Sequence, residues 1–464
     1  MLIIKTLRLV AILFLHLFLL INTRFTLWPE MIVYPYLLNN GFSLYTDIIN
    51  PYPPVLTSLL SLFSQRFGYL ASPYQILTWI IIFLIDISIF AITKKIFKKD
   101  NFALISTAFF AVFSIPFAVN GLWFDLVQTP LVLAAFYFFF KYMDNQNKKN
   151  LFFTFFLISI AFFIKQQVIL LFFWFITLII FKSGKKTVKI IGNSFLYIPL
   201  ALLFLIFGTI FYFENSLNQF LYWTFAFPFF KASNMPGYIQ LPNLKQIAVL
   251  ISLFVIFIPS LKSKFKIIPQ TAFILVLFAY PRFDYFHLIP SLSILSIAAG
   301  VNLKNLQDAK TYQKTLFVFA FIFLVFFTIR YHLNNWGEEV RFFDRESLTT
   351  ASFLERITVL SSTIYVQNGP DQILPISNRL PPKPWVDEFS WYLETPGMQE
   401  RIIESLKNSP PQFVVFKPYS QGTPYQLGSY RPTSLAEFLD SNYQNLIQIS
   451  DNIWLKVKKK ESSN

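Results

Sequence analysis

The chain has 464 residues, of which 55% are hydrophobic and only 14% are charged, and its mean hydropathy is +0.52. A soluble domain carries about 25% charged residues, so most of this chain is expected to face lipid. The net charge of +15 does not indicate nucleic acid, because the excess of Lys and Arg lies in the apolar part, where it sets membrane orientation and contacts lipid headgroups. The lack of cysteine excludes disulfides and cysteine-based zinc sites, and three dispersed histidines do not form a metal-site pattern.

A membrane-spanning helix needs about 20 apolar residues. The apolar segments that meet or approach this length predict a polytopic α-helical membrane protein with about eleven spans. These lie at residues 6–23, 72–93, 102–119, 127–143, 151–164, 167–181, 188–213, 246–260, 267–280, 286–300 and 315–331. The segment 53–70 carries Ser, Thr, Gln and Arg on one side, which predicts a helix lying along the membrane surface in the first external loop.

The loops between these segments alternate in charge. One set of loops, with the N-terminus, carries 19 Lys and Arg residues, whereas the other set carries six. The positive-inside rule therefore predicts a multi-pass protein of the plasma membrane whose N-terminus is cytoplasmic. The basic set holds Lys5, Arg8 and residues 94–100, 141–150, 182–189, 262–266 and 302–314; the external set holds 24–71, 120–126, the region around 165, 214–245 and 281–285.

From about residue 332 the composition becomes that of a soluble domain. Segments 358–366, 412–418 and 452–457 predict strands, and segments 394–410 and 433–443 predict helices. The sequence thus predicts a transmembrane domain at 1–331 and a small α/β domain at 332–464. With an odd number of spans, this second domain is expected outside the cell. Residues 368–372 and 380–385 are interpreted as turns rather than as sites.

A polar loop at residues 24–54 interrupts the apolar N-terminal half. An acid soon after the first span is followed by a Gly, a Tyr-x-Asp step and a Pro-Pro pair that opens the surface helix, at Glu30, Gly41, Tyr45, Asp47, Pro53 and Pro54. This string resembles the first external loop of GT-C glycosyltransferases, in the branch of protein O-mannosyltransferases and the lipid A aminoarabinose transferase. Those enzymes usually have Asp or Asp-Glu where this chain has Pro29-Glu30.

The resemblance implies a reaction. A sugar would pass from a polyprenyl phosphate to an acceptor hydroxyl at the outer face, in a single displacement that inverts the anomeric configuration. A carboxylate must take the hydroxyl proton, and Glu30 is the first choice over Asp47. The expected partners are the lipid-linked sugar, membrane lipids and an acceptor that is a protein, a lipid or a glycan. No cofactor is implied with certainty, and participation of a divalent cation is left open.

The expected ligands of the donor phosphate are Lys165, Arg282 and His287. Lys165 lies between two apolar runs, where an ionised group costs roughly 2.5 kcal/mol or more unless it reaches a headgroup, a cavity or a partner. Relatives carry a Lys-Gln pair at such a break, and here Gln166 follows. Asp125 is expected as a second acid, and Gln166 and Asp125 are assigned to the acceptor. Interfacial anchoring of both cations and helix capping by Asp125 are the alternative interpretations.

Two other functional classes fit this composition. A transporter or flippase of a lipid-linked saccharide would need charged groups inside the membrane, of which Asp86 is the main example. A non-catalytic envelope assembly protein would account for the soluble domain but would leave the carboxylate loop unexplained. The sequence therefore favours the glycosyltransferase.

Overall fold

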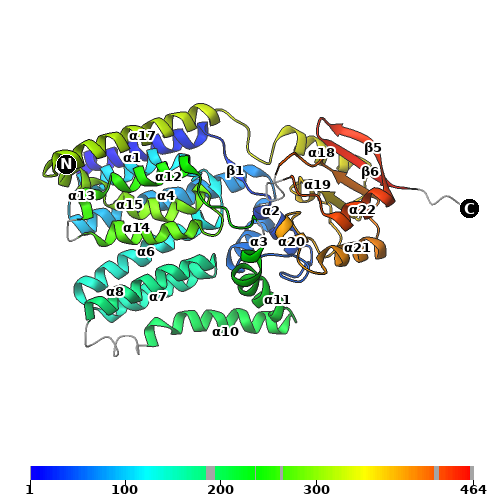
Figure 1. Cartoon of the computed structure of the whole chain (residues 1–464), viewed down its shortest axis with the longest axis horizontal. Helices are drawn as coiled ribbons and strands as arrows, with labels where there is room; N and C mark the ends of the chain where they lie inside the picture. The colour runs from blue at the N-terminus through cyan, green and yellow to red at the C-terminus, as the bar shows by residue number, and fades with distance from the viewer. Residues whose placement is uncertain (1, 184–193, 236, 262–264, 423–427, 460–464) are drawn as a thin grey trace, which may run out of the picture. The chain divides into compact units, whose positions relative to one another are not determined.

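The computed structural model describes residues 2–183, 194–235, 237–261, 265–422 and 428–459 (Figure 1). Most of residues 182–189, which were predicted as a basic loop, lie outside these ranges. The chain divides into two compact units. The helical unit comprises Met1–Thr26, Gln75–Thr209 and Gln240–Glu338, and the mixed unit comprises Leu27–Tyr74, Ile210–Ile239 and Glu339–Asn464. Each unit is built from three separate stretches of sequence.

The helical unit contains the apolar segments of the sequence, and the described part of each predicted span is mainly helical. Its helices are α1 (Leu2–Asn22), α4 (Ala71–Phe97), α5 (Asp100–Phe113), α6 (Phe124–Asn145), α7 (Lys148–Phe162), α8 (Ile169–Ser183), α10 (Ile198–Phe213), α12 (Leu244–Val255), α13 (Ile258–Leu261), α14 (Ile267–Leu275), α15 (Ile289–Ile297), α16 (Ala299–Gln307) and α17 (Thr311–Asn335). Short elements join them: η1 (Ile115–Phe117), η2 (Gln166–Val168), η4 (Ser194–Leu196), η7 (Val276–Ala279), η8 (Tyr285–Leu288), β1 (Thr26–Leu27) and β2 (Gly121–Leu122).

Three helices in the described part of the chain, α4, α6 and α17, are long and apolar enough to cross a membrane. A pair bent by 52°, Tyr285–Ile297 and Ala299–Gln307, would make a fourth span. The other apolar helices are shorter. The structure is therefore that of a mostly helical membrane protein, while the predicted number of spans and their orientation stay predictions.

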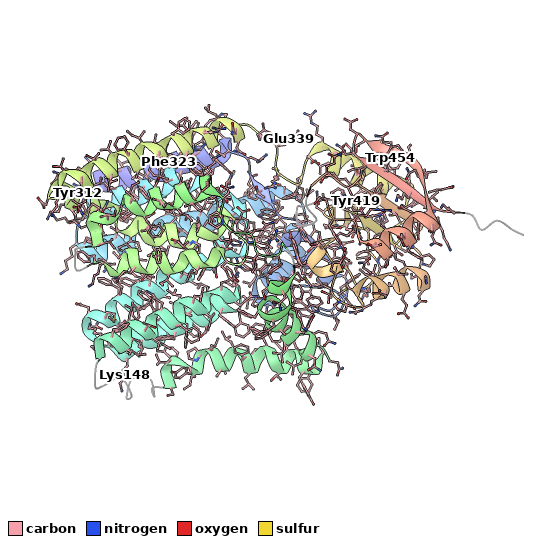
Figure 2. All side chains as sticks on the ribbon, in the orientation of Figure 1. Lys148, Tyr312, Phe323, Glu339, Tyr419 and Trp454 are labelled. Carbon is pink, nitrogen blue, oxygen red and sulfur yellow. The ribbon has the colours of Figure 1, made fainter. Side chains whose placement is uncertain are left out.

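Helices of this unit turn apolar side chains outward and bond their polar groups internally. On α17, which carries Tyr312 and Phe323 (Figure 2), Phe319 and Ile322 are among the exposed apolar side chains. Buried hydroxyls donate to the carbonyl four residues earlier, as Ser296 does to Leu292 at 2.7 Å. Hydrogen bonds of this kind suit helices in lipid, because no water is present to satisfy a polar group.

The mixed unit combines short helices with one four-stranded sheet. The sheet order is β3 (Ile364–Gln367), β4 (Phe413–Phe416), β6 (Ile453–Lys458) and β5 (Tyr443–Ser450), and only the β3–β4 pair is parallel. The helices are α2 (Glu30–Asn39), α3 (Val55–Phe67), α11 (Leu217–Leu221), the π-helix η5 (Tyr222–Lys231), η6 (Ala232–Asn234), α18 (Arg345–Ile357), α19 (Ile373–Ser377), α20 (Ser390–Leu393), α21 (Met398–Asn408) and α22 (Thr433–Asn442). The three strands expected from the sequence are β3, β4 and β6, and β5 is additional.

Backbone hydrogen bonds join the first loop to the C-terminal residues within the mixed unit. Trp385 N donates to Asp47 O at 2.7 Å, and Ile49 N donates to Trp385 O at 3.2 Å. The ammonium of Lys383 donates to the Asp47 carboxylate and to the carbonyl of Gly41. The first loop and the segment around Trp385 therefore fold as one body. The predicted domain boundary at 331/332 stays a prediction.

The predicted surface segment 53–70 contains the helix α3. Its small polar residues face inward, where Ser61 donates to Asn39 Oδ1 and Asn39 donates to Ser64. Its apolar residues Leu59 and Leu62 are exposed. An outward apolar face suits a helix that rests on lipid.

A close approach of α5 and α16 gives a test of the packing of the helical unit. A Cβ on Gly300 would lie 2.5 Å from Cα and O of Phe102, so Gly300→Ala is expected to destabilise the fold by about 1–3 kcal/mol. Gly208 on α10 has nothing within 4 Å of its Cβ position, which makes Gly208→Ala the control. Thermal unfolding in detergent measures both variants. Equal or higher stability of the Gly300 variant would contradict this packing.

Candidate functional site

Three charged or titratable side chains meet inside the helical unit. Lys165 Nζ lies 2.5 Å from Asp125 Oδ2, and His287 Nδ1 lies 2.8 Å from the same oxygen. The distance between Lys165 Nζ and His287 Nδ1 is 2.9 Å. All three residues are buried, and we call them the Asp–Lys–His centre. The structure thus brings together residues that lie up to 162 positions apart in sequence.

Breaks in the helices position these side chains. Asp125 stands in the first turn of α6, after the extended residue Trp123. Lys165 has an extended backbone, with φ −152° and ψ 124°, in the break between α7 and η2. His287 belongs to η8, directly before α15. Helix ends leave backbone groups without intrahelical partners, so polar side chains gather at such positions.

The centre balances one negative and one positive charge. Two ionised groups out of water need each other, because an isolated buried charge is costly. Gln128 adds a bond from its amide to Asp125 Oδ1 at 3.1 Å. His287 Nδ1 can donate to Asp125 or accept from Lys165, but not both at once. Lys165, which was expected at the donor phosphate, is therefore held in place by Asp125, which was expected at the acceptor.

Gln166 and Arg282, the other two site residues predicted in this unit, lie close in sequence to members of the Asp–Lys–His centre. Gln166 is buried beside Lys165 at the start of η2. Arg282 is half-buried in a segment that pairs with Gln240, since Phe283 N donates to Gln240 O at 2.8 Å. It precedes His287 by five residues. The assignment of Arg282 to a phosphate stays a prediction.

Asp86, noted in the sequence as a mid-span acid, pairs with a histidine of the first helix. His16 Nδ1 lies 2.7 Å from Asp86 Oδ2, and both residues are fully buried. The pair joins α1 to α4 inside the helical unit. This arrangement fits a structural hydrogen-bonded pair within the bundle.

In the mixed unit, Glu30 is a half-buried residue at the start of α2. Its Oε2 atom is inaccessible and makes no hydrogen bond with any residue that the structure describes. Burial raises the pKa of Glu30 to about 7, although its own backbone N–H lowers it somewhat. A carboxyl with this pKa is ionised in about half of the molecules at neutral pH, which suits a general base.

Three further acids belong to the same environment and were missed by the sequence analysis. Burial raises the pKa of Asp387 well above its usual range, and the charges of Glu30 and Asp371 add to this effect. The pKa of Asp371 is raised well above its usual range by burial and by the charges of Glu388 and Glu30. Burial raises the pKa of Glu388 to about 7. We call Glu30, Asp371, Asp387 and Glu388 the carboxyl cluster.

Neutral donors hold the members of the carboxyl cluster. The hydroxyl of Tyr34 donates to Asp387 Oδ2 at 3.0 Å, and that of Tyr365 donates to Glu388 Oε1 at 2.8 Å. Since neighbouring carboxylates repel, their charges add to burial in raising the pKa values of Asp371 and Asp387. No local pattern marks this cluster, because Asp371 lies in a segment that was interpreted as a turn and Asp387 lies two residues beyond another such segment.

Asp47 has a different environment from Glu30. It is partly exposed, and its Oδ2 atom lies 2.9 Å from Lys383 Nζ. The same oxygen accepts a bond from Ser43 N at 3.0 Å and so closes a tight turn. Its carboxylate is therefore engaged in holding the first loop, which favours Glu30 as the reactive acid.

The carboxyl groups described above contact ammonium, imidazole, amide and hydroxyl groups of the protein. In the part of the chain that the structure describes, no group of three or more His, Asp or Glu side chains could hold a metal ion. The Asp125 carboxylate is taken up by Lys165, His287 and Gln128. No residue is therefore assigned to a divalent cation.

The Asp–Lys–His centre gives a stability test. Asp125→Asn should leave a buried lysine without a counter-charge and destabilise the protein by about 3–5 kcal/mol. Adding Lys165→Met removes the stranded charge, so the double variant should recover most of the loss. Thermal unfolding in detergent measures the cycle, with the exposed acid Asp308→Asn as control. If the stability losses of Asp125→Asn and Lys165→Met simply add in the double variant, the two side chains do not stabilise each other.

Comparisons with known proteins give one family match and several similar structures. Residues 51–213 match the family model of dolichyl-phosphate-mannose-protein mannosyltransferases. A search of curated proteins gives no match. The structure resembles that of ArnT from Cupriavidus metallidurans bound to undecaprenyl phosphate, with a TM-score of 0.63, 12% identity and coverage of 99% of this chain and 98% of that chain.

A second similar structure is the oligosaccharyltransferase of Archaeoglobus fulgidus tethered to an acceptor peptide. Its TM-score is 0.59 at 10% identity, and the match covers 95% of this chain and 72% of that chain. At these identities the structural matches establish the fold. Together with the family match they confirm the predicted resemblance, and the chain has the fold of the GT-C superfamily of membrane glycosyltransferases.

Proposed function

We propose that this protein transfers a sugar from a polyprenyl-phosphate donor to an acceptor hydroxyl at the outer face of the membrane. One observation supports this beyond the fold: Glu30 has a buried carboxyl oxygen without a hydrogen bond in the described structure and a pKa of about 7. Asp47, in contrast, is paired with Lys383. The similarity to ArnT bound to undecaprenyl phosphate supports the class of donor.

In the proposed reaction the acceptor oxygen bonds to the anomeric carbon while the bond from that carbon to the phosphate oxygen breaks. Glu30 takes the hydroxyl proton, and the polyprenyl phosphate leaves with the electron pair. The anomeric configuration inverts because a single displacement occurs. This scheme uses only the anomeric carbon of the sugar, which hexoses and pentoses share. We therefore propose a hexosyl- or pentosyltransferase.

We assign the leaving phosphate to Lys165, with His287 and Arg282 as further donors. A phosphate carries more negative charge than the Asp125 carboxylate, so it can draw one N–H of the ammonium toward itself. Asp125 would then keep Lys165 charged and oriented, with Gln166 beside it as an additional polar group. The Asp125→Asn/Lys165→Met variant, if folded as predicted above, should have lost donor turnover.

The division into units supports the proposed topology. The mixed unit consists of 27–74, 210–239 and 339–464, and these overlap the three longest stretches that the charge rule and the odd number of spans predict to lie outside. The predicted basic loops belong to the helical unit. We therefore propose about eleven spans, a cytoplasmic N-terminus and an extracytoplasmic domain at 332–464, in the plasma membrane.

A matched pair of acid variants tests the base. Glu30→Gln should lower the release of polyprenyl phosphate by about 10²–10⁴-fold, because no other group takes the proton. Asp47→Asn should keep activity within about tenfold of wild type, since Asp47 bonds Lys383 and its own turn. The assay uses purified protein with a panel of polyprenyl-phosphate sugars and acceptors. If Glu30→Gln keeps full activity, or if wild type moves the lipid-linked sugar without cleaving it, the proposal is wrong.

The pH dependence gives a second test of the base. A general base must be ionised, and the raised pKa means that the ionised fraction of Glu30 falls as pH drops below about 7. We expect log(kcat/KM) to be flat above that pH and to decrease by about one unit for each pH unit below it. Activity measured from pH 5.5 to 8.5 shows the bend, and Asp47→Asn should bend at the same pH. A flat profile across this range would contradict the role of Glu30.

A further inference from the structure

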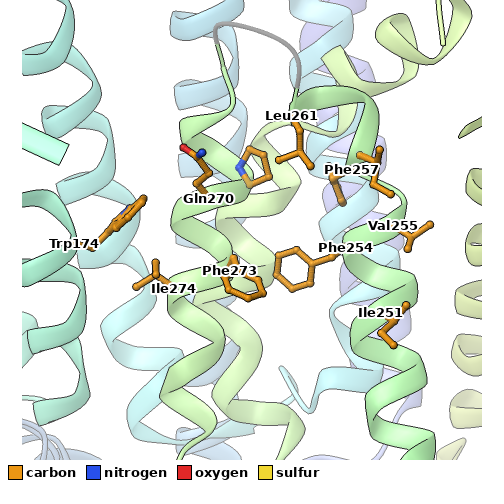
Figure 3. Close-up of a pocket in the computed structure, with 11 residues that line it drawn as sticks. Trp174, Ile251, Phe254, Val255, Phe257, Leu261, Gln270, Phe273 and Ile274 are labelled. Atoms are coloured by element: carbon orange, nitrogen blue, oxygen red, sulfur yellow. The ribbon is translucent and has the colours of Figure 1, made fainter. Parts of the chain in front are cut away.

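An apolar groove runs along the outside of the helical unit (Figure 3). Its volume is about 430 Å³, and it lies between α12, α13, α14 and α8. Figure 3 shows Leu261 and Gln270 near the end where α13 and α14 are connected, and Ile251 toward the other end. Apart from Gln270, the lining side chains are apolar. The shape and lining suit a hydrocarbon chain rather than a polar ligand.

The walls of the groove offer little polar surface to an occupant. Ile251 is 58% exposed and Phe273 is 63% exposed, so the groove is open at the side of the bundle. The indole N–H of Trp174 donates to Thr271 Oγ1 at 3.0 Å, which leaves the ring of Trp174 as its contribution to the wall. An apolar chain entering from lipid would therefore displace no hydrogen bond of this tryptophan.

Lysines at the end of α4, at the start of α14 and within α16 lie toward the connected end of the groove. Phe97 packs edge-to-face against Phe265 with ring centroids 4.5 Å apart, and Lys98 and Lys266 are their sequence neighbours. On α16, Asn302 bonds to Ser260 and to the carbonyl of Ile256, and Lys304 follows two residues later.

The three side chains Lys98, Lys266 and Lys304 are exposed. Among nearby acids, Asp100 is paired with Lys94 at 2.9 Å, and Asp308 is one helical turn beyond Lys304. The positive charge at this end is thus only partly compensated. We call Lys98, Lys266 and Lys304 the basic rim.

We propose that this groove is a binding site for an anionic phospholipid, with one acyl chain along the groove and the phosphate on the basic rim. Basic pockets between membrane helices bind anionic headgroups, and each lysine near such a headgroup contributes roughly fivefold to affinity. A zwitterionic lipid would gain less from the three lysines, because its own cation opposes theirs. This inference requires the membrane location alone and is independent of sugar transfer.

The test measures which lipids the purified protein retains. Wild type is reconstituted in nanodiscs of equal phosphatidylglycerol and phosphatidylcholine, and native mass spectrometry reads the lipids that stay bound. We expect preferential retention of phosphatidylglycerol. Lys98→Gln/Lys266→Gln/Lys304→Gln should abolish the preference, and Ile251→Trp, which fills the groove, should reduce retention of the lipid itself.

Two controls separate the site from general charge and hydrophobicity. Lys141→Gln/Lys148→Gln/Lys149→Gln removes three exposed lysines near the connection of α6 and α7, and Ile322→Trp enlarges an exposed side chain on α17. Both should leave the preference unchanged. Equal retention of the two lipids by wild type, loss of preference in the control lysine variant, or retention of a polyprenyl lipid at this position would each overturn the proposal.

Discussion

An ionisable side chain in an apolar environment must either pair with an opposite charge or favour its neutral form, and this constraint accounts for both polar regions of the protein. In the helical unit the first solution applies, because Asp125 meets Lys165 and His287 within hydrogen-bond distance. In the mixed unit the second applies, because burial without a cation raises the pKa of Glu30. A paired charge is a stable binding group, whereas a carboxyl poised near neutrality can exchange a proton. The two solutions therefore suit the two roles that sugar transfer from a phosphate requires.

The mixed unit shows how the second environment is built from distant parts of the chain. The first loop supplies Glu30 and Tyr34, and the C-terminal residues supply Asp387 and the acids beside it. Backbone bonds between Asp47 and Trp385 and the ion pair with Lys383 join the two stretches. The C-terminal residues thus do more than cover the loop, since their own carboxyls respond to it: the charge of Glu30 adds to burial in raising the pKa of Asp371 and of Asp387.

Part of this could be predicted from the sequence. Apolar length and loop charge indicated the helical segments, and the resemblance around Glu30 indicated the GT-C fold. The break at Lys165 was recognisable because a lysine with two glutamines cannot continue an apolar run. β5 was missed because its apolar residues Leu446 and Ile447 are adjacent, which breaks the alternation typical of a half-buried strand. Asp371 and Asp387 were missed because their significance arises from contacts with a loop more than 300 residues earlier, which no local pattern reports.

The account depends on one property of one side chain, the proton affinity of Glu30. Infrared difference spectroscopy of the carboxyl band, wild type against Glu30→Gln across a pH titration, measures it directly. The structure predicts that the band assigned to Glu30 titrates at about pH 7. Titration near the value of an ordinary solvated glutamate, about 4.3, would show that this carboxyl lies in water and would remove the basis for its role as the base.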